Sequence, residues 1–146
     1  MSRKIRVGVN GFGRIGRYFT RLCLQHEDIE VVAINDLAPI DTLTHLLRYD
    51  SVHGRLEGVF QVNGNTLKLP TGNEIIFTQF TDPSSIPWGE MNVDIVIEST
   101  GKFLTKESAV GHLNAGAKQV ILSAPAKGDD IPTVVLGVNE SLINQS

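Results

Sequence analysis

The chain has 146 residues, a hydrophobic fraction of 41% and a formal net charge of −3. This length suffices for one domain with a substantial core, and the negative balance argues against a general affinity for nucleic acid. A single cysteine, no apolar leader before the first strand and no stretch long enough to span a bilayer favour a cytoplasmic protein without a membrane partner.

The first predicted element is a buried strand over residues 5–9, which runs into a glycine-rich turn. Gly11, Gly13 and Gly16 follow with the spacing G-x-G-x-x-G. Between a strand and a helix, this spacing is typical of dinucleotide binding. Its glycines permit the tight turn, the approach of the backbone to a pyrophosphate, and close packing of helix on strand. The pyrophosphate would lie at the helix N-terminus, where unpaired N–H groups and the helix dipole favour an anion.

The helix after this turn is predicted from Ile15, Tyr18, Phe19 and Leu22, which are spaced to share one face. We expect this face to be the buried one. Cys23 is next to Leu22, so we expect its thiol to be buried and inert rather than a nucleophile.

Three arginines, Arg14, Arg17 and Arg21, recur along the same helix. Such a stripe can contact nucleic acid, but the net charge of the chain argues against that use. We expect a solvated or subunit-facing stripe, with Arg14 close enough to the glycine turn to matter for a ligand.

A second apolar run, over residues 30–34, ends at Asn35-Asp36. Asp36 lies 20 residues after Gly16, the distance at which an acidic side chain accepts hydrogen bonds from the adenosine ribose. Strand, turn, helix, strand and acid therefore agree on a dinucleotide-binding unit. Asp36 favours NAD over NADP because its carboxylate would repel a 2′-phosphate.

The middle of the chain is predicted to hold a short helix that ends near Arg48, followed by a β-hairpin. Asn63-Gly64 is a strong hairpin-turn signal, and residues 59–62 and 66–69 are the predicted strands beside it. A further strand is predicted over residues 74–78.

The second half of the chain opens with residues 82–89, in which two prolines exclude a regular element. Strand and helix then alternate. The predicted elements are a strand over residues 93–98, a helix from an N-cap at Thr105 to a terminal glycine at Gly116, and strands over residues 118–123 and 133–138.

This alternation predicts an α/β fold: a Rossmann-type, mostly parallel open sheet with helices on both faces and a β-hairpin insertion. Ligands of such sheets lie at the carboxyl ends of the strands. In this chain these ends are Asn10-Gly11, Asn35-Asp36, Ser99-Thr100-Gly101 and Ser123-Ala124-Pro125.

Six segments stand in a distinctive order: residues 10–17 (NGFGRIGR), 35–37 (NDL), 49–55 (YDSVHGR), 86–89 (IPWG), 98–101 (ESTG) and 123–125 (SAP). In this they closely resemble the N-terminal domain of phosphorylating glyceraldehyde-3-phosphate dehydrogenase, from about Ile5 to Asn139. The resemblance implies a glycolytic enzyme that oxidises glyceraldehyde 3-phosphate to 1,3-bisphosphoglycerate through a thioester, passes hydride to NAD and then captures inorganic phosphate.

The same resemblance implies a cofactor site. The backbone from Gly11 to Ile15 would hold the pyrophosphate, Asp36 the adenosine ribose, and the later strand ends the rest of NAD. The expected cofactor-binding residues are Asn10, Gly11, Phe12, Gly13, Arg14, Ile15, Asp36, Ser99, Thr100, Gly101 and Ser123. No residue is assigned to catalysis, and the four scattered histidines lack metal-ligand spacing.

The family's nucleophilic cysteine, in a Ser-Cys-Thr-Thr-Asn stretch, would be expected shortly after Ser146, and its catalytic histidine further on. We therefore expect residues 1–146 to form a dinucleotide-binding domain without the catalytic domain, able to bind NAD but not to catalyse. The intact protein would be a homotetramer, but that assembly rests on contacts from the absent domain.

Two alternatives remain open. One is a fragment of the sister enzyme that acts on erythrose 4-phosphate, which shares this domain. The other is a stand-alone nucleotide-binding module used for interaction or RNA binding. A reading frame that continues to Ser-Cys-Thr-Thr-Asn and a later histidine would favour an enzyme.

Overall fold

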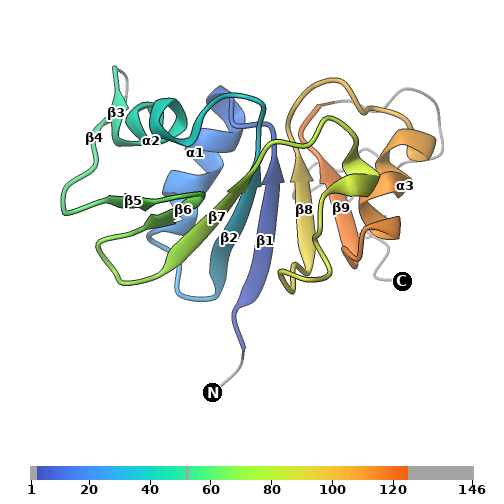
Figure 1. Ribbon diagram of the computed structural model, residues 1–146, viewed down its shortest axis with the longest axis horizontal. Helices are drawn as coiled ribbons and strands as arrows, with labels where there is room; N and C mark the ends of the chain where they lie inside the picture. The colour runs from blue at the N-terminus through green and yellow to red at the C-terminus, as the bar shows by residue number, and fades with distance from the viewer. Residues whose placement is uncertain (1–2, 52, 125–146) are drawn as a thin grey trace, which may run out of the picture.

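A mostly parallel sheet carries the fold (Figure 1). The structure is a computed structural model that describes residues 3–51 and 53–124, so the strand predicted over residues 133–138 lies outside the described residues. Within these ranges seven strands form one sheet in the order β5-β6-β7-β2-β1-β8-β9. They are β1 (Ile5–Asn10), β2 (Ile29–Asn35), β5 (Gln61–Asn63), β6 (Thr66–Lys68), β7 (Glu74–Thr78), β8 (Ile95–Glu98) and β9 (Gln119–Leu122).

The remaining described elements are three α-helices, a short 3-10 helix and a small ribbon. They are α1 (Arg14–Cys23), α2 (Ile40–Arg48), α3 (Lys106–Asn114), η1 (Pro83–Ser85), and the antiparallel pair β3 (Tyr49–Asp50) and β4 (Gly54–Arg55). The 3-10 turn η1 corrects the expectation that residues 82–89 hold no regular element: Pro83 stands at its start, where a missing N–H is harmless.

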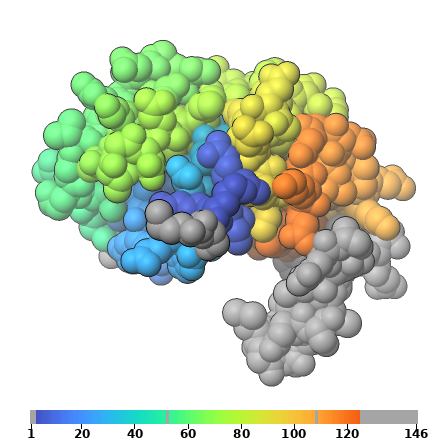
Figure 2. All heavy atoms as spheres, turned by 90° about the horizontal axis from the view of Figure 1, so that it is seen from below, coloured from blue at the N-terminus to red at the C-terminus, as the bar shows by residue number. Residues whose placement is uncertain are grey.

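The strand β1 is the middle one of five parallel strands, β7-β2-β1-β8-β9, and pairs with β2 on one side and β8 on the other. Seen from below, the dark blue residues of β1 lie in the middle of the molecule (Figure 2). Strands β7 and β9 extend the parallel part. Strand β6 runs in the opposite direction, so its pairs with β5 and β7 are antiparallel. The predicted Rossmann-type fold with a hairpin insertion is confirmed.

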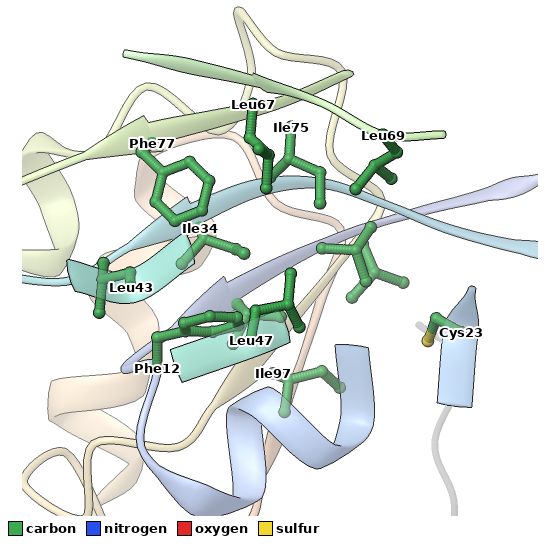
Figure 3. Packing of buried hydrophobic residues seen from close by; sticks show 13 residues of the cluster. Phe12, Cys23, Ile34, Leu43, Leu47, Leu67, Leu69, Ile75, Phe77 and Ile97 are labelled. Carbon is green, nitrogen blue, oxygen red and sulfur yellow. The ribbon is translucent and has the colours of Figure 1, made fainter. Parts of the chain in front are cut away.

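Helices cover both faces of the sheet. The chain moves one way from β1 to β2 and the opposite way from β8 to β9. Because such crossovers are right-handed, α1 and α3 fall on opposite faces. On one face, α2 contributes Leu43 and Leu47 to a core with Ile34 and Phe77 (Figure 3). On the other, Trp88 and Val96 belong to a second cluster beside α3.

The prediction that the large apolar side chains of α1 form its buried face is wrong. Ile15, Tyr18 and Leu22 are exposed, with 57%, 43% and 49% of their surface accessible. Of the predicted four, only Phe19 packs against the core.

Small residues form the buried face of α1 instead, namely Gly16, Thr20 and Cys23. A Cβ at Gly16 would lie 2.3 Å from the carbonyl oxygen of Gly11, and the Thr20 hydroxyl donates back to the Gly16 carbonyl at 2.8 Å. The helix lies so close to β1 that large side chains have no room on this face.

Arg21 is also buried, at 8% exposure, so the arginine stripe is not solvated throughout. Its guanidinium donates to the carbonyls of Leu47 (3.0 Å), Arg48 (3.1 Å) and Gly54 (2.8 Å). Carbonyls at the C-terminal end of a helix lack intrahelical partners, and Arg21 supplies one for the end of α2. Arg14 is exposed, as expected.

The hairpin is present, but its turn lies one residue beyond the predicted position. Asn63 pairs with Thr66, so Gly64 and Asn65 are the two turn residues. Gly64 has φ +61° and Asn65 does not have a positive φ, as in a type II′ turn with glycine in the first central position. The glycine decides the turn type, and it sets the register here.

The end of α3 confirms the predicted glycine. Gly116 has φ +112°, and the Ala117 N–H returns to the carbonyl of His112 at 3.1 Å. Such a left-handed glycine is the usual way to satisfy the last helical carbonyls. Helix α3 starts directly after Thr105.

Gly8 has a packing role in β1. Val7 and Val9 point into the first core, and Gly8 faces the fully buried Trp88 of the second. A Cβ at Gly8 would lie 2.4 Å from Cζ3 of the indole ring. The central strand therefore needs a glycine where Trp88 crosses it.

We predict that Gly8→Ala lowers the free energy of unfolding by about 3 kcal/mol, because neither the central strand nor the buried ring has space to move. Urea denaturation measures this. Gly13→Ala is the matched control: its φ is −76° and a Cβ there would meet nothing within 4 Å. We expect Gly13→Ala to lower the free energy of unfolding by less than about 1 kcal/mol, because it changes only the cap of a helix. Equal losses in the two variants would contradict this account of Gly8.

Candidate functional site

The sheet has a topological switch point between β1 and β8, because the order of the strands reverses there. The connections that leave these neighbouring strands go to opposite faces, and in open α/β sheets the crevice for a ligand lies at the carboxyl ends of such a pair. Gly11 follows β1 and Ser99 follows β8, and the Ser99 hydroxyl donates to the Gly11 carbonyl at 2.6 Å. The two loops predicted to bind a ligand therefore meet at this crevice.

The three glycines of the turn serve different needs. Gly11 has φ +91°, and a Cβ there would lie 2.8 Å from the backbone nitrogen of Thr100. Gly16 is required for the approach of α1 to the turn. Gly13 has neither constraint, so the protein itself does not require a glycine at that position.

The surface in front of Gly13 is suited to an anion. Gly13 is the N-cap of α1, no side chain caps this helix end, and the first turn has no acidic residue. A helix N-terminus of this kind offers backbone N–H groups and the positive end of the dipole to a phosphate. A glycine at this position keeps the approach to those N–H groups open.

Asp36 is held beside the glycine turn. Its Oδ2 accepts the Phe12 N–H at 2.7 Å, and its Oδ1 accepts the Ala38 N–H at 3.0 Å. The carboxylate is half-buried. Since each carboxylate oxygen can accept a second hydrogen bond, Asp36 can still receive ligand hydroxyls.

The hydroxyl groups of Ser99 and Thr100 donate to the protein itself. Ser99 donates to the Gly11 and Asn10 carbonyls, and Thr100 donates to Oε2 of Glu98 at 2.5 Å. These side chains therefore hold the turn. Gly101 has φ +75°, and a Cβ there would meet nothing within 4 Å.

Ser123 follows β9, further along the same edge of the sheet, and its backbone N–H donates to the Glu98 carbonyl at 3.0 Å. All of the predicted cofactor residues thus belong to the carboxyl ends of β1, β2, β8 and β9 or to the start of α1.

A buried polar cluster under this edge was missed by sequence reasoning. The Glu98 carboxylate, 1% exposed, accepts hydrogen bonds from Asn10 (2.7 Å), His112 (2.7 Å) and Thr100. Burial by itself raises the pKa of Glu98, but the hydrogen bonds from His112, Thr100 and Asn10 outweigh it and hold the pKa below its usual value. A glutamate at the end of a strand buried on both faces was the available signal.

Cys23 is buried at the opposite end of α1 from the glycine turn (Figure 3). Burial raises the pKa of its thiol to about 11, so little thiolate forms near neutral pH. The expectation that Cys23 is buried is confirmed.

Residues 3–51 and 53–124 contain no group of three His, Cys, Asp or Glu residues placed to hold a metal ion. None of the helices in these ranges has the length and apolar character needed to cross a bilayer.

Comparison with known families bears on the site directly. The family model described as glyceraldehyde 3-phosphate dehydrogenase, NAD binding domain, matches residues 5–106. The chain belongs to this family. The match includes the glycine turn, Asp36 and the Ser99-Thr100-Gly101 loop, and it ends before Ser123.

Similar proteins carry the same name. The chain is 58% identical over 136 residues to glyceraldehyde-3-phosphate dehydrogenase from Geobacillus stearothermophilus, covering 93% of this chain and 40% of that protein. It is 51% identical over 143 residues to the protein of that name from Mycoplasma pneumoniae (98% and 42% covered). It is 49% identical over 137 residues to the cytosolic one from Trypanosoma brucei brucei (94% and 41%). The chain thus spans about two fifths of the length of these relatives.

Proposed function

We propose that residues 1–146 are the NAD-binding domain of a longer, phosphorylating glyceraldehyde-3-phosphate dehydrogenase. The observation that carries the proposal is the family match over residues 5–106, which coincides with an uncapped helix N-terminus at the switch point of the sheet. The other three fifths of the relatives' length would supply the nucleophilic cysteine and the catalytic histidine. The intact protein would be a cytoplasmic homotetramer that works in glycolysis.

Each group at the crevice has a role in this proposal. The pyrophosphate binds the backbone from Gly11 to Ile15, with the exposed Arg14 beside it. Asp36 accepts hydrogen bonds from the adenosine ribose. The loop after β8, together with Ser123, lines the path toward the nicotinamide. NAD would supply the hydride acceptor, and this domain holds the adenosine and the pyrophosphate of NAD.

The substrate is proposed from the names of the relatives, all of which specify glyceraldehyde 3-phosphate. An enzyme acting on erythrose 4-phosphate would share this domain and differ mainly outside it. A stand-alone nucleotide-binding module would also bind NAD. The reading frame beyond Ser146 separates an enzyme from a stand-alone module, since only an enzyme needs the Ser-Cys-Thr-Thr-Asn stretch.

The chain should prefer NAD to NADP by at least tenfold. Asp36 is fixed in place by two backbone N–H groups, so its negative charge cannot turn away from a 2′-phosphate. Equilibrium titration of both cofactors measures the preference. Asp36→Ala should narrow it, and Asp41→Ala, in an exposed position on α2, should leave it unchanged. Equal affinities of the unmodified chain for NAD and NADP would refute this role of Asp36.

The chain alone should not oxidise glyceraldehyde 3-phosphate, although it binds NAD. A thioester needs an accessible thiolate and a neighbouring base, and Cys23 is buried with its pKa raised to about 11. NADH absorbance in a steady-state assay measures turnover, with an intact homologous enzyme, which has both the Ser-Cys-Thr-Thr-Asn stretch and the later histidine, as positive control. Turnover by the chain that disappears in Cys23→Ser would contradict the prediction.

ADP-ribose should bind the chain within about tenfold of NAD, a difference of about 1.4 kcal/mol. The groups placed at the crevice face the pyrophosphate and the adenosine. In the family, the nicotinamide is oriented mainly by the other half of the protein. Calorimetric titration of both ligands at one salt concentration tests this. A much tighter affinity for NAD would mean that this domain grips the nicotinamide itself.

A further inference from the structure

A chain of hydrogen bonds runs along the carboxyl edge of the sheet, beneath the proposed NAD site. Each of the four neighbouring strands β8, β1, β2 and β7 contributes to it, through Glu98, Asn10, Asn35 and the segment Thr78–Phe80. The Asn10 amide donates to Glu98 Oε1 at 2.7 Å, and the Asn35 amide donates to Asn10 Oδ1 at 2.9 Å. We call these four groups the edge relay.

The relay has a fixed direction at the Glu98 end. An indole N–H can only donate, and that of Trp88 donates to Nδ1 of His112 at 2.9 Å. The hydrogen of His112 is therefore on Nε2, from which it is donated to Glu98 Oε1. Thr100 donates its N–H (2.9 Å) and its hydroxyl to Oε2. Four donors thus converge on Glu98, which can act only as an acceptor.

The far end of the relay agrees with this direction. Asn35 Nδ2 donates to the Phe80 carbonyl at 2.9 Å, and Asn35 Oδ1 accepts the Phe80 N–H at 2.9 Å and the Thr78 hydroxyl at 2.7 Å. The Asn35 amide therefore has all its donors and acceptors engaged. Since Asn10 and Asn35 are each 3% exposed, neither amide can turn over without leaving buried groups unpaired.

The relay is next to the residues that would hold NAD. Asn10 precedes the glycine turn, and Asn35 precedes Asp36. Thr100, held by Glu98, packs against Gly11 so closely that a Cβ on Gly11 would meet it. Glu98 itself is too deeply buried to touch a ligand.

We propose that Glu98 is a positioning residue for NAD: its carboxylate sets the direction of the edge relay and so fixes the glycine turn relative to Asp36. The inference rests on the proposed function, since it concerns a ligand that contacts both the turn and Asp36. A ligand that bridges these two groups depends on their separation and orientation. Adenosine, which lacks the pyrophosphate, depends on Asp36 but not on the turn.

Glu98→Gln tests this, because it keeps the shape of the side chain but replaces one acceptor oxygen by an NH₂ group. That group must face either Asn10 and His112 or Thr100, all of which donate. We expect the affinity for NAD and for ADP-ribose to fall by about tenfold or more, while the affinity for adenosine changes by less than about twofold. Calorimetry measures the affinities for NAD and ADP-ribose, and a titration followed by amide chemical shifts measures the affinity for adenosine.

The ratio of the affinities separates positioning from a merely structural role. Partial unfolding lowers the apparent affinity for all three ligands by the same factor. An equal loss for NAD and adenosine would therefore overturn the proposal, as would no loss for either. Glu90→Gln, in an exposed turn, removes the same charge and should leave all three affinities unchanged.

A second variant covers the case in which Glu98→Gln does not fold. His112→Gln disturbs the relay from α3, away from the crevice. It should lower the affinities by a smaller factor, again more for NAD and ADP-ribose than for adenosine. An unchanged ratio of the affinities for NAD and adenosine in the folded variant would overturn the proposal.

If the unmodified chain binds neither NAD nor ADP-ribose, the proposed function fails. If it binds them and Glu98→Gln binds them equally well, only the inference about Glu98 fails.

Discussion

The approach of α1 to the end of β1 is the constraint on which the site depends. The carbonyl of Gly11 occupies the space that a Cβ of Gly16 would need, so the helix starts directly over the carboxyl end of the central strand. That position places an uncapped helix N-terminus at the switch point of the sheet. An anion there meets backbone N–H groups that no side chain of α1 caps. The position of α1 and the proposed phosphate site thus depend on the same contact.

The same contact explains what the sequence could and could not predict. The glycine spacing, the acid after the second strand and the order of strands and helices all follow from local patterns, and the structure has them. The buried face of α1 does not follow from a local pattern, because a periodicity argument assigns large apolar residues to the buried face. Gly16 and Thr20 are buried for the opposite reason: they are small. Arg21 is buried because carbonyls at the end of α2 and in β4 converge on it, and these are distant in sequence.

The edge relay was beyond sequence reasoning for a related reason. Its hydrogen-bonded members are 25 to 88 residues apart in the chain, and Glu98, Asn10 and Asn35 each look like an ordinary polar residue at the end of a strand. Only the register of β8 on β1 and of β1 on β2 brings them into one line. A buried carboxylate is unfavourable unless its hydrogen bonds are satisfied. The sequence shows the glutamate, and the fold shows why it is tolerated.

The relay also connects the site to the core on one face of the sheet. Trp88 packs on Gly8 of the central strand and donates to His112, which donates to Glu98. A change in the packing around Trp88 can therefore reach Thr100 and Asn10 through two side chains. The opposite core, around Leu47 and Phe12, reaches the glycine turn through Phe12 itself. The crevice is thus supported from both faces of the sheet, which suits a rigid platform for a cofactor better than a surface that closes around one.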